Sequence, residues 1–284
     1  MAERYARLGL IAGGGDLPVH VAEAARAEGR LGCVIALEKF ADPSRYAEAE
    51  TIRIGQIGAI FQALKAANCD AVCFAGSVPR PDFSTIRPDM KGVSLLPKVL
   101  AAAARGDDAL LRAVVEIFER EGLSVIGADE IADGLKARPG LVGRIGPDDA
   151  ARRDGLKALR IAGIIGAEDI GQGAVVCDNL VLAVEAQEGT DRMLARVAEL
   201  PLAVRGTPEA RRGVLAKRPK PVQERRVDLP VIGVSTVEGA ARAGLAGIAA
   251  PAGGALIIGH DAVGRAADAA GLFVWITDGE EDAP

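Results

Sequence analysis

Aromatic residues, histidines and long apolar runs are all scarce in this sequence, and each shortage narrows what the chain can be. Aromatic residues make up 3% of the 284 residues, so Ala, Val, Ile and Leu must build the hydrophobic cores. No apolar run approaches the ~20 residues that a transmembrane helix needs. The first residues, Met1 to Arg7, also lack the apolar stretch of a signal peptide. We therefore expect a cytoplasmic protein.

Basic residues are not in excess either. Lys and Arg number 34 against 39 Asp and Glu, a net charge of −5, which argues against a general nucleic-acid-binding protein. The two histidines, His20 and His260, are far apart in the chain, so they suggest neither a zinc cluster nor a local Ser-His-Asp or Cys-His arrangement. The four cysteines are expected to be buried free thiols. They are Cys33, Cys69, Cys73 and Cys177.

The first half of the chain alternates between strand-like and helix-like segments. The apolar run from Leu8 to Ala12 ends in three glycines, and a helical pattern from Leu17 to Glu28 leads to a second apolar run from Gly32 to Leu37. Helices over residues 57–67 and 110–121 and strands over 71–75 and 124–127 continue the alternation. This order predicts a Rossmann-like α/β domain over residues 1–138, with about four parallel strands and helices on both faces.

Glycine and proline punctuate residues 134–147, which we interpret as a linker or domain edge. The chain is long enough for two domains, and residues 139–284 are predicted to form a second, mixed α/β domain. Its expected elements are a helix over 148–162, a hairpin of strands 174–177 and 180–185 that turns at Asp178-Asn179, a helix over 191–199 capped by Thr190, and strands over 213–216, 255–258 and 272–276.

Four places in the sequence suggest chemistry, and the first is the glycine loop Gly13-Gly14-Gly15-Asp16. A glycine turn between a strand and a helix lets backbone N–H groups approach an anion, and the helix dipole adds to the attraction. A dinucleotide fingerprint would need glycine where Pro18 stands, so we expect a nucleotide phosphate or uridine here rather than NAD. The alternative is a tight structural turn.

The second place follows the predicted strand over residues 71–75. Gly76 ends that strand at what would be the carboxyl edge of the sheet, where open α/β sheets bind ligands. Ser77 and Arg80 would both face that crevice. The alternative is a proline-rich surface loop whose arginine is solvated.

The third place joins a predicted strand to a predicted helix. Glu185 ends a strongly apolar segment, and Glu188 and Asp191 lie near the start of the helix that follows. Carboxylates at this position suit a hard cation such as Mg²⁺, and Gly189 and Thr190 would meet a phosphate group. The alternative is a capped helix with acidic residues in its first turn. A carboxylate in an apolar strand is costly without a partner, which favours the metal site.

The fourth place is a basic stretch in a chain of net negative charge. Eight basic and only two acidic residues lie between Arg205 and Arg226. Lysine and arginine side chains neutralise a diphosphate as it is attacked, and prolines on both sides of Lys220 hold the loop extended. Asp228 lies just before an apolar segment, where it would bind metal or activate water. The alternative is a solvated basic loop.

Five stretches spread over both halves of the chain carry a family resemblance. They are residues 9–18 (GLIAGGGDLP), 74–78 (FAGSV), 108–112 (DALLR), 182–191 (LAVEAQEGTD) and 220–230 (KPVQERRVDLP). The sequence resembles the LpxI-type UDP-2,3-diacylglucosamine pyrophosphatases through them, from residue 8 to about residue 275. That family usually has Gln-Asp where this chain has Gln223-Glu224. We therefore place the essential acidic residue first at Asp228 and second at Glu224.

The resemblance implies a two-domain α/β enzyme with its active site in the cleft between the domains. It implies Mg²⁺-dependent hydrolysis of UDP-2,3-diacylglucosamine to UMP and 2,3-diacylglucosamine 1-phosphate (lipid X), a step in lipid A synthesis. Water would attack the phosphorus on the sugar side, and an apolar pocket would hold two acyl chains. We also expect peripheral contact with the inner membrane, a homodimer and no nucleic-acid partner.

Each candidate residue has an expected role. The expected catalytic residues are Asp228, Glu224 and Lys220. The expected metal ligands are Asp191, Glu185 and Asp228. The residues expected to bind the substrate are Gly13, Gly14, Gly15, Asp16, Ser77, Arg80, Gly189, Thr190, Lys217 and Gln223.

Two other functions compete with this hypothesis. An NAD-dependent or nucleotide-sugar oxidoreductase would use the glycine loop, but Pro18 and the lack of a Tyr-x-x-x-Lys pattern count against it, since Tyr5 and Tyr46 are the only tyrosines. A non-enzymatic carrier of lipid or nucleotide would have no reason to place carboxylates beside a basic loop.

Overall fold

The computed structural model describes residues 5–79, 82–221 and 223–278, which form two compact units. The first unit contains the chain up to Asp133 together with the short segment Glu224–Asp228. The second unit contains residues 134–223 and the chain from Leu229 onward. The sequence predicts residues 224–228 to lie in the second domain. In the structure they pack with the first unit, so the chain passes from one unit to the other three times.

A five-stranded sheet forms the centre of the first unit, in the order β3-β2-β1-β4-β5. The strands are β1 (Leu8–Ala12), β2 (Leu31–Leu37), β3 (Glu50–Ile52), β4 (Ala71–Ala75) and β5 (Ser124–Val125). All four pairings between neighbours are parallel. β1 is buried along its whole length, as expected for a central strand that is covered on both faces. The predicted Rossmann-like α/β fold is confirmed.

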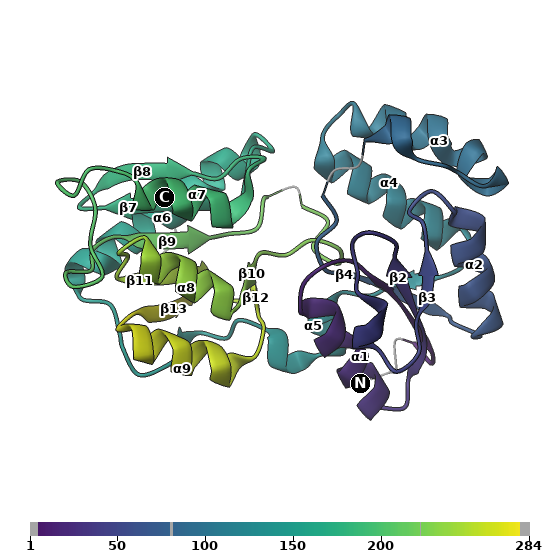
Figure 1. The fold of residues 1–284 in the computed structure, drawn as a ribbon, viewed down its shortest axis with the longest axis horizontal. Coiled ribbons are helices and arrows are strands. Elements are labelled where there is room, and N and C mark those ends of the chain that lie inside the picture. The colour runs from purple at the N-terminus through teal and green to yellow at the C-terminus, as the bar shows by residue number, and fades with distance from the viewer. Residues whose placement is uncertain (1–4, 80–81, 222, 279–284) are drawn as a thin grey trace. The chain divides into compact units, whose positions relative to one another are not determined.

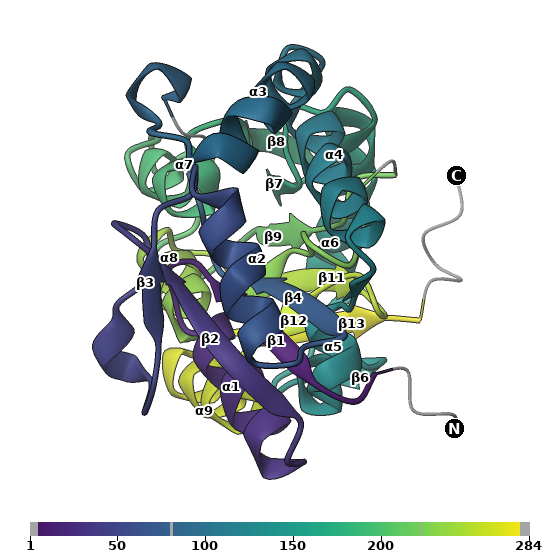
Figure 2. The ribbon, with the colours of Figure 1, turned by 90° about the vertical axis from the view of Figure 1, so that its right-hand side faces the viewer.

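Helices cover both faces of this sheet (Figures 1 and 2). The helices are α1 (Leu17–Ala27), α2 (Ile57–Ala66), α3 (Met90–Ala103), α4 (Asp107–Arg120) and α5 (Ala128–Ile131). α1 and α5 pack together on one face, and α2 and α4 lie on the other, where α3 packs on them. The core under α2 and α4 contains Ile11, Ile35, Leu64, Val72 and Phe118. α3 and the short edge strand β3 are not among the elements that the sequence predicts.

The second unit has a mixed six-stranded sheet in the order β6-β13-β11-β9-β7-β8. Its strands are β6 (Gly140–Leu141), β7 (Gly173–Cys177), β8 (Leu180–Val184), β9 (Val214–Lys217), β11 (Gly247–Pro251) and β13 (Phe273–Thr277). β11 pairs in parallel with β9 and β13, whereas β6, β7 and β8 join in antiparallel pairs. A separate parallel pair joins β10 (Val231–Ile232) to β12 (Leu256–Ile257). The predicted mixed α/β class is therefore confirmed.

Two separate cores bury the faces of this sheet. α6 (Asp149–Ala167) packs on β7, β9 and β11, and its side chains form one core with Trp275 and Phe273. α7 (Gly189–Ala198), α8 (Val234–Arg242) and α9 (His260–Ala270) contribute to the larger core, which contains Met193, Val237 and Val263. Among the described residues, no helix is both long and apolar enough to cross a membrane.

The predicted hairpin of the second unit is present, with a two-residue turn at Asp178-Asn179. Both turn residues have positive φ, 49° and 64°, which Asp and Asn tolerate and which a type I′ turn requires. The buried carboxylate of Asp154 accepts hydrogen bonds from both turn N–H groups, at 2.8 and 2.7 Å. The turn is therefore fixed by its own residue types and by one carboxylate on α6.

The helix that follows the hairpin begins earlier than the sequence predicted. α7 starts at Gly189 with Glu188 as its N-cap residue, and no side chain caps it. Thr190, the expected cap, instead donates its hydroxyl hydrogen bond to Oε1 of Glu185 at 2.9 Å. The prediction of a threonine cap was wrong because a buried carboxylate competes for the same hydroxyl group.

Candidate functional site

The glycine loop joins β1 to α1 at the carboxyl edge of the first sheet, as predicted. The N–H groups of Gly13 and Gly14 donate to the carbonyls of Ala75 and Ser77, at 2.8 and 2.9 Å, and the Ser77 N–H donates back to Gly14. A Cβ atom at Gly13 would come within 2.8 Å of the Ser77 carbonyl, so glycine is required for this close approach. The loops that follow β1 and β4 are thus paired through their backbones.

Because of this pairing, fewer backbone N–H groups of the glycine loop can bind a phosphate. Two of its amide groups are already used within the protein, and Gly15 and Asp16 are the exposed residues of the loop. Arg45 lies against them, because its guanidinium donates to the Gly15 carbonyl at 2.9 Å and to the Asp16 carboxylate at 2.7 Å. The loop therefore has a cation beside it that was not predicted, since Arg45 ends a short 3₁₀ helix (Pro43–Arg45) that carries no recognisable motif.

Ser77 is exposed directly after Gly76, whose φ of +92° forms the turn that leaves β4. A Cβ atom at Gly76 would come within 2.5 Å of the Gly14 carbonyl. Ser77 therefore lies beside the glycine loop, as the sequence suggested. Arg80, the other residue expected here, lies outside the described residues.

Glu185 follows β8 in the second unit and is only 5% exposed. Its Oε1 atom accepts the hydrogen bond from Thr190, whereas its Oε2 atom is buried and has no hydrogen-bond partner among the described residues. Gly171 and Gly173 lie against it, and a Cβ atom at Gly173 would come within 2.6 Å of Oε2. A buried carboxylate oxygen without a donor is a suitable ligand for a cation or the site of a proton.

The other acidic residues near Glu185 face solvent or an arginine. Asp191 is exposed in the first turn of α7. Glu188 pairs with Arg196 at 2.8 Å. Hydrogen bonds from backbone N–H groups hold the pKa of Glu188 below its ordinary value, and the bond from Arg196 acts in the same direction. Within the described part of the chain, no group of three or more His, Cys, Asp or Glu residues could hold a metal ion. The described residues therefore supply one buried ligand candidate here, Glu185, without an assembled metal site.

The basic stretch begins at the end of β9. Lys217 is 6% exposed, and its ammonium group donates to the Val231 carbonyl at 2.9 Å. Lys220 pairs with Asp169 at 2.6 Å, and its backbone N–H donates to the side chain of Gln223 at 2.8 Å. Lys220 and Gln223 are therefore brought together, and Lys217 is held separately by its bond to Val231. Asp169 was not predicted, because it lies in the turn after α6, 51 positions from Lys220.

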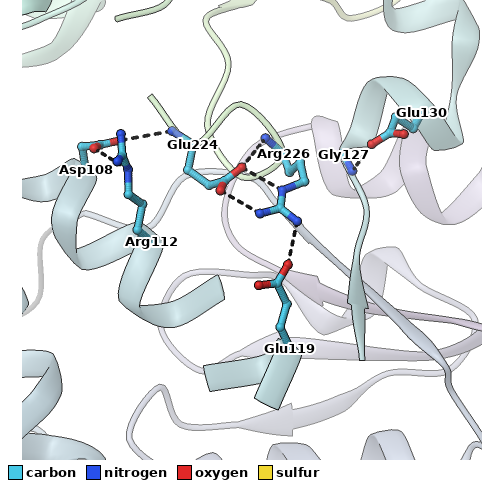
Figure 3. A network of polar contacts seen from close by, with 7 residues as sticks. All are labelled: Asp108, Arg112, Glu119, Gly127, Glu130, Glu224 and Arg226. Atoms are coloured by element: carbon cyan, nitrogen blue, oxygen red, sulfur yellow. Dashed lines mark hydrogen bonds and ion pairs between the residues drawn. The ribbon is translucent and has the colours of Figure 1, made fainter. Parts of the chain in front are cut away.

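The segment Glu224–Asp228 is anchored to α4 of the first unit by the polar network in Figure 3. Arg226 binds both carboxylate oxygens of Glu224 at 2.8 Å and also donates to Glu119 at 2.8 Å. The Glu224 N–H donates to Asp108 at 3.1 Å, and Asp108 pairs with Arg112 at 2.9 Å. The sequence did not indicate the links to Asp108 and Glu119, since they join residues more than 100 positions apart.

The network also sets the charge state of its members. Hydrogen bonds from Arg226 lower the pKa of the Glu224 carboxyl, and the same bonds raise the pKa of the Arg226 guanidinium. Both groups are therefore charged at neutral pH. The N–H groups of Val227 and Asp228 donate to the Glu224 carbonyl, and this turn places Asp228 in a partly buried position.

Two family models match the chain, one for each half. The LpxI N-terminal domain matches residues 7–135, and the LpxI C-terminal domain matches residues 138–275. The chain belongs to the LpxI family. A relative in the LpxI family, the UDP-2,3-diacylglucosamine pyrophosphatase LpxI of Caulobacter vibrioides, is 55% identical over 277 residues, which cover 97% of this chain and 99% of that protein.

The LpxI C-terminal match includes residues 224–228, although these residues pack with the first unit. The candidate residues of this LpxI-family chain thus form three groups. The first unit holds the glycine loop with Ser77 and, separately, Glu224 with Asp228. The second unit holds the others, which are Glu185, Gly189, Thr190, Asp191, Lys217, Lys220 and Gln223.

Proposed function

We propose that this protein hydrolyses the diphosphate of UDP-2,3-diacylglucosamine to UMP and 2,3-diacylglucosamine 1-phosphate. The observation that carries the proposal is the 55% identity to the Caulobacter vibrioides enzyme over nearly the full length of both chains. The five motifs that suggested the family all lie within the residues that the two family models match. The enzyme would accordingly be a hydrolase that acts on a phosphoric anhydride.

Asp228 is the acidic residue that we assign to activating the attacking water. Glu224 was the second choice, and its position supports that order, because both of its oxygens already accept hydrogen bonds from Arg226. A guanidinium that binds both oxygens stabilises the charged carboxylate and so makes it a weaker base. Glu224 would instead hold the segment that carries Asp228, through its own N–H group and its bond to Arg226.

Lys217 and Lys220 are the cations that we assign to the diphosphate. Lys217 is buried, so its charge acts in a medium where electrostatic attraction is stronger than in water. Lys220 would exchange its ion pair with Asp169 for a phosphate oxygen. Neutralising charge as it develops on the leaving phosphate is the main demand of phosphoryl transfer.

Mg²⁺ is the proposed cofactor, and Glu185 is the described residue that fits it best, through its buried Oε2 atom. When bound, the ion would neutralise charge on the diphosphate and make a bound water more acidic. Asp191 and Asp228 remain predicted ligands. The cleft between the domains, peripheral contact with the inner membrane and a homodimer also remain predictions.

A labelling experiment tests the function. The purified protein is incubated with UDP-2,3-diacylglucosamine, with Mg²⁺ or EDTA, in ¹⁸O water, and both products are analysed by mass spectrometry. We expect UMP and the sugar 1-phosphate, with the label in the sugar phosphate and with little turnover in EDTA. Asp228→Asn should bind the substrate but lose turnover by at least ~100-fold, as expected for the loss of a general base. Binding of the substrate without release of UMP by the wild-type protein would favour a carrier.

A further inference from the structure

Two thiols of the first unit lie next to each other although they are 36 positions apart in the sequence. The Sγ atoms of Cys33 and Cys69 are 3.8 Å apart, which is hydrogen-bonding distance for sulfur. Both cysteines are free and partly buried, and both pack against the core under α2 and α4. A disulfide needs an Sγ–Sγ distance of ~2.05 Å, so the sulfurs must approach by less than ~2 Å for the bond to form.

The backbone of Cys69 is fixed by the end of α2. Asn68 takes the left-handed conformation with φ of 52°, and its N–H donates to the Lys65 carbonyl at 3.0 Å. The Cys69 N–H donates to the Leu64 carbonyl at 2.9 Å. This pair of bonds is the Schellman arrangement that closes a helix. Cys69 is therefore held in one place and is not part of a loose loop.

The backbone of Cys33 is fixed by the sheet, and glycines make room for the sulfur that meets it. Cys33 lies in β2 opposite Gly9 of β1. A Cβ atom at Gly32 would come within 2.6 Å of the Cys69 Sγ atom, and one at Gly9 would come within 3.4 Å. Because both positions lack a side chain, the sulfur of Cys69 lies directly over the sheet beside Cys33.

The two thiols differ in the direction in which their pKa values are shifted. The hydrogen bond with Cys33 lowers the pKa of the Cys69 thiol, with Arg7 acting in the same direction and burial acting against them. The same hydrogen bond, together with burial, raises the pKa of the Cys33 thiol. Cys69 is therefore the better thiolate and Cys33 the thiol beside it. A reactive thiolate next to a second, resolving thiol is the arrangement found in cysteines that respond to oxidants.

We propose that Cys33 and Cys69 are a redox modification site that forms a reversible disulfide on contact with a peroxide. The Cys69 thiol loses its proton, the thiolate attacks one oxygen of hydrogen peroxide, and the O–O bond breaks. Cys69 becomes a sulfenic acid, and the departing hydroxide takes up a proton, which replaces the one that Cys69 lost, and leaves as water. The sulfur of Cys33 then attacks the sulfur of Cys69 and loses its proton, the S–O bond breaks, and a second water leaves. Two thiols are oxidised and one peroxide is reduced. A dithiol such as dithiothreitol reverses the reaction and becomes oxidised itself.

The disulfide would tie β2 to the turn that leads into β4, across the central strand β1. Such a bond restricts the unfolded chain over a loop of more than 30 residues, which stabilises the folded state. We therefore expect the oxidised protein to unfold several degrees higher than the reduced protein. Because the bond lies away from Asp228 and the lysines in the sequence, this proposal does not depend on the proposed hydrolysis.

Peptide mapping of the full-length wild-type protein tests the proposal directly. The reduced protein is treated with hydrogen peroxide, its remaining thiols are blocked with N-ethylmaleimide in a denaturant that exposes the buried cysteines, and it is digested without reductant. We expect one cross-linked peptide pair that contains Cys33 and Cys69, two blocked thiols at Cys73 and Cys177, and four blocked thiols after dithiothreitol. Oxidation that leaves Cys33 and Cys69 unlinked, or that joins either to another cysteine or to a second chain, would overturn it.

Three serine variants separate the roles of the cysteines. Cys33→Ser should leave a sulfenic acid at Cys69 that dimedone labels, whereas Cys69→Ser should show much less labelling of Cys33. Cys73→Ser is the matched control, since Cys73 is buried in β4 of the same sheet, and it should still form the cross-link. Equal labelling of the two single thiols would contradict the assignment of Cys69 as the attacking group.

Discussion

At the scale of single residues, Glu185 is the side chain whose surroundings most need an explanation. A buried carboxylate loses its hydration, and its charged form is stable only when donors or a cation replace the lost water. Thr190 supplies one donor to one oxygen, and the second oxygen has none among the described residues. A bound cation at Oε2 would remove this deficit. The burial of Glu185 is therefore explained if part of its stabilisation comes from a metal ion.

Glu185→Gln is predicted to abolish most of the stabilisation of the protein by Mg²⁺. An ion that binds only the folded state stabilises it by about 2.7 kcal/mol at a concentration 100 times its dissociation constant. We expect the wild-type melting temperature to rise on titration with MgCl₂ and the variant to show little rise, as measured by differential scanning calorimetry. Glu188→Gln is the control, because Glu188 already pairs with Arg196 and should not be needed. An equal rise in all three proteins would remove Glu185 from the metal ligands.

At the scale of elements, the polar links around Arg226 explain how a five-residue segment stays attached to α4. Arg226 binds two carboxylates, those of Glu224 and Glu119. Its bidentate bond to Glu224 has the geometry that gives charge-assisted hydrogen bonds their strength. Val227 adds an apolar contact with the core of the first unit. The position of Asp228 therefore depends on this small network rather than on a helix or strand.

Arg226→Ala is predicted to lower the free energy of unfolding by about 1–2 kcal/mol and to lower kcat more than it changes KM. The estimate allows for the partial exposure of the pair. Turnover falls because Asp228 loses its fixed position, whereas substrate binding by the lysines is retained. Urea unfolding and steady-state kinetics measure the two effects. Lys98→Ala is the control. It removes a different ion pair with α4, in which the Lys98 ammonium lies 2.7 Å from the Glu116 carboxylate, and it should leave kcat unchanged.

The same network makes stability depend on pH in a stated direction. The pKa of Glu224 is lowered in the folded state, so its contribution is present above the ordinary value of 4.5 and is lost as the pH falls through the lowered value. Glu224→Gln removes that contribution at every pH. The difference in unfolding free energy between wild type and variant should therefore be constant above about pH 5.5 and shrink below it. A difference that grows with acidity would contradict the lowered pKa.

The elements that could be predicted from the sequence are those whose determinants are local. Asp178 and Asn179 specify a tight hairpin by themselves, since both tolerate positive φ. The start of α7 was misplaced because the Thr190 hydroxyl bonds to a carboxylate outside the helix. The attachment of residues 224–228 to the first unit was not predictable, because Asp108 and Glu119 are distant in sequence and carry no mark of their partners.

At the scale of the whole molecule, the chain does not divide into two units at a single point. It leaves the first unit after Asp133, returns at Glu224 and leaves again after Asp228. The N-terminal part still contains its complete sheet and the core under α2 and α4. A fragment of residues 1–138 should therefore fold. It lacks the segment that forms hydrogen bonds with Asp108 and Glu119 and packs Val227 against the core.

A peptide of residues 223–230 is predicted to bind this fragment and restore the missing contacts. Saturating peptide should raise the melting temperature of the fragment by a few degrees, because a ligand that binds only the folded state stabilises it. The same peptide with Arg226→Ala should raise it much less, since the bonds to Glu224 and Glu119 are lost. Calorimetric melting of the fragment with each peptide measures the difference. If both peptides act equally, the segment is held by Val227 and its backbone, and the charged network does not determine where Asp228 lies.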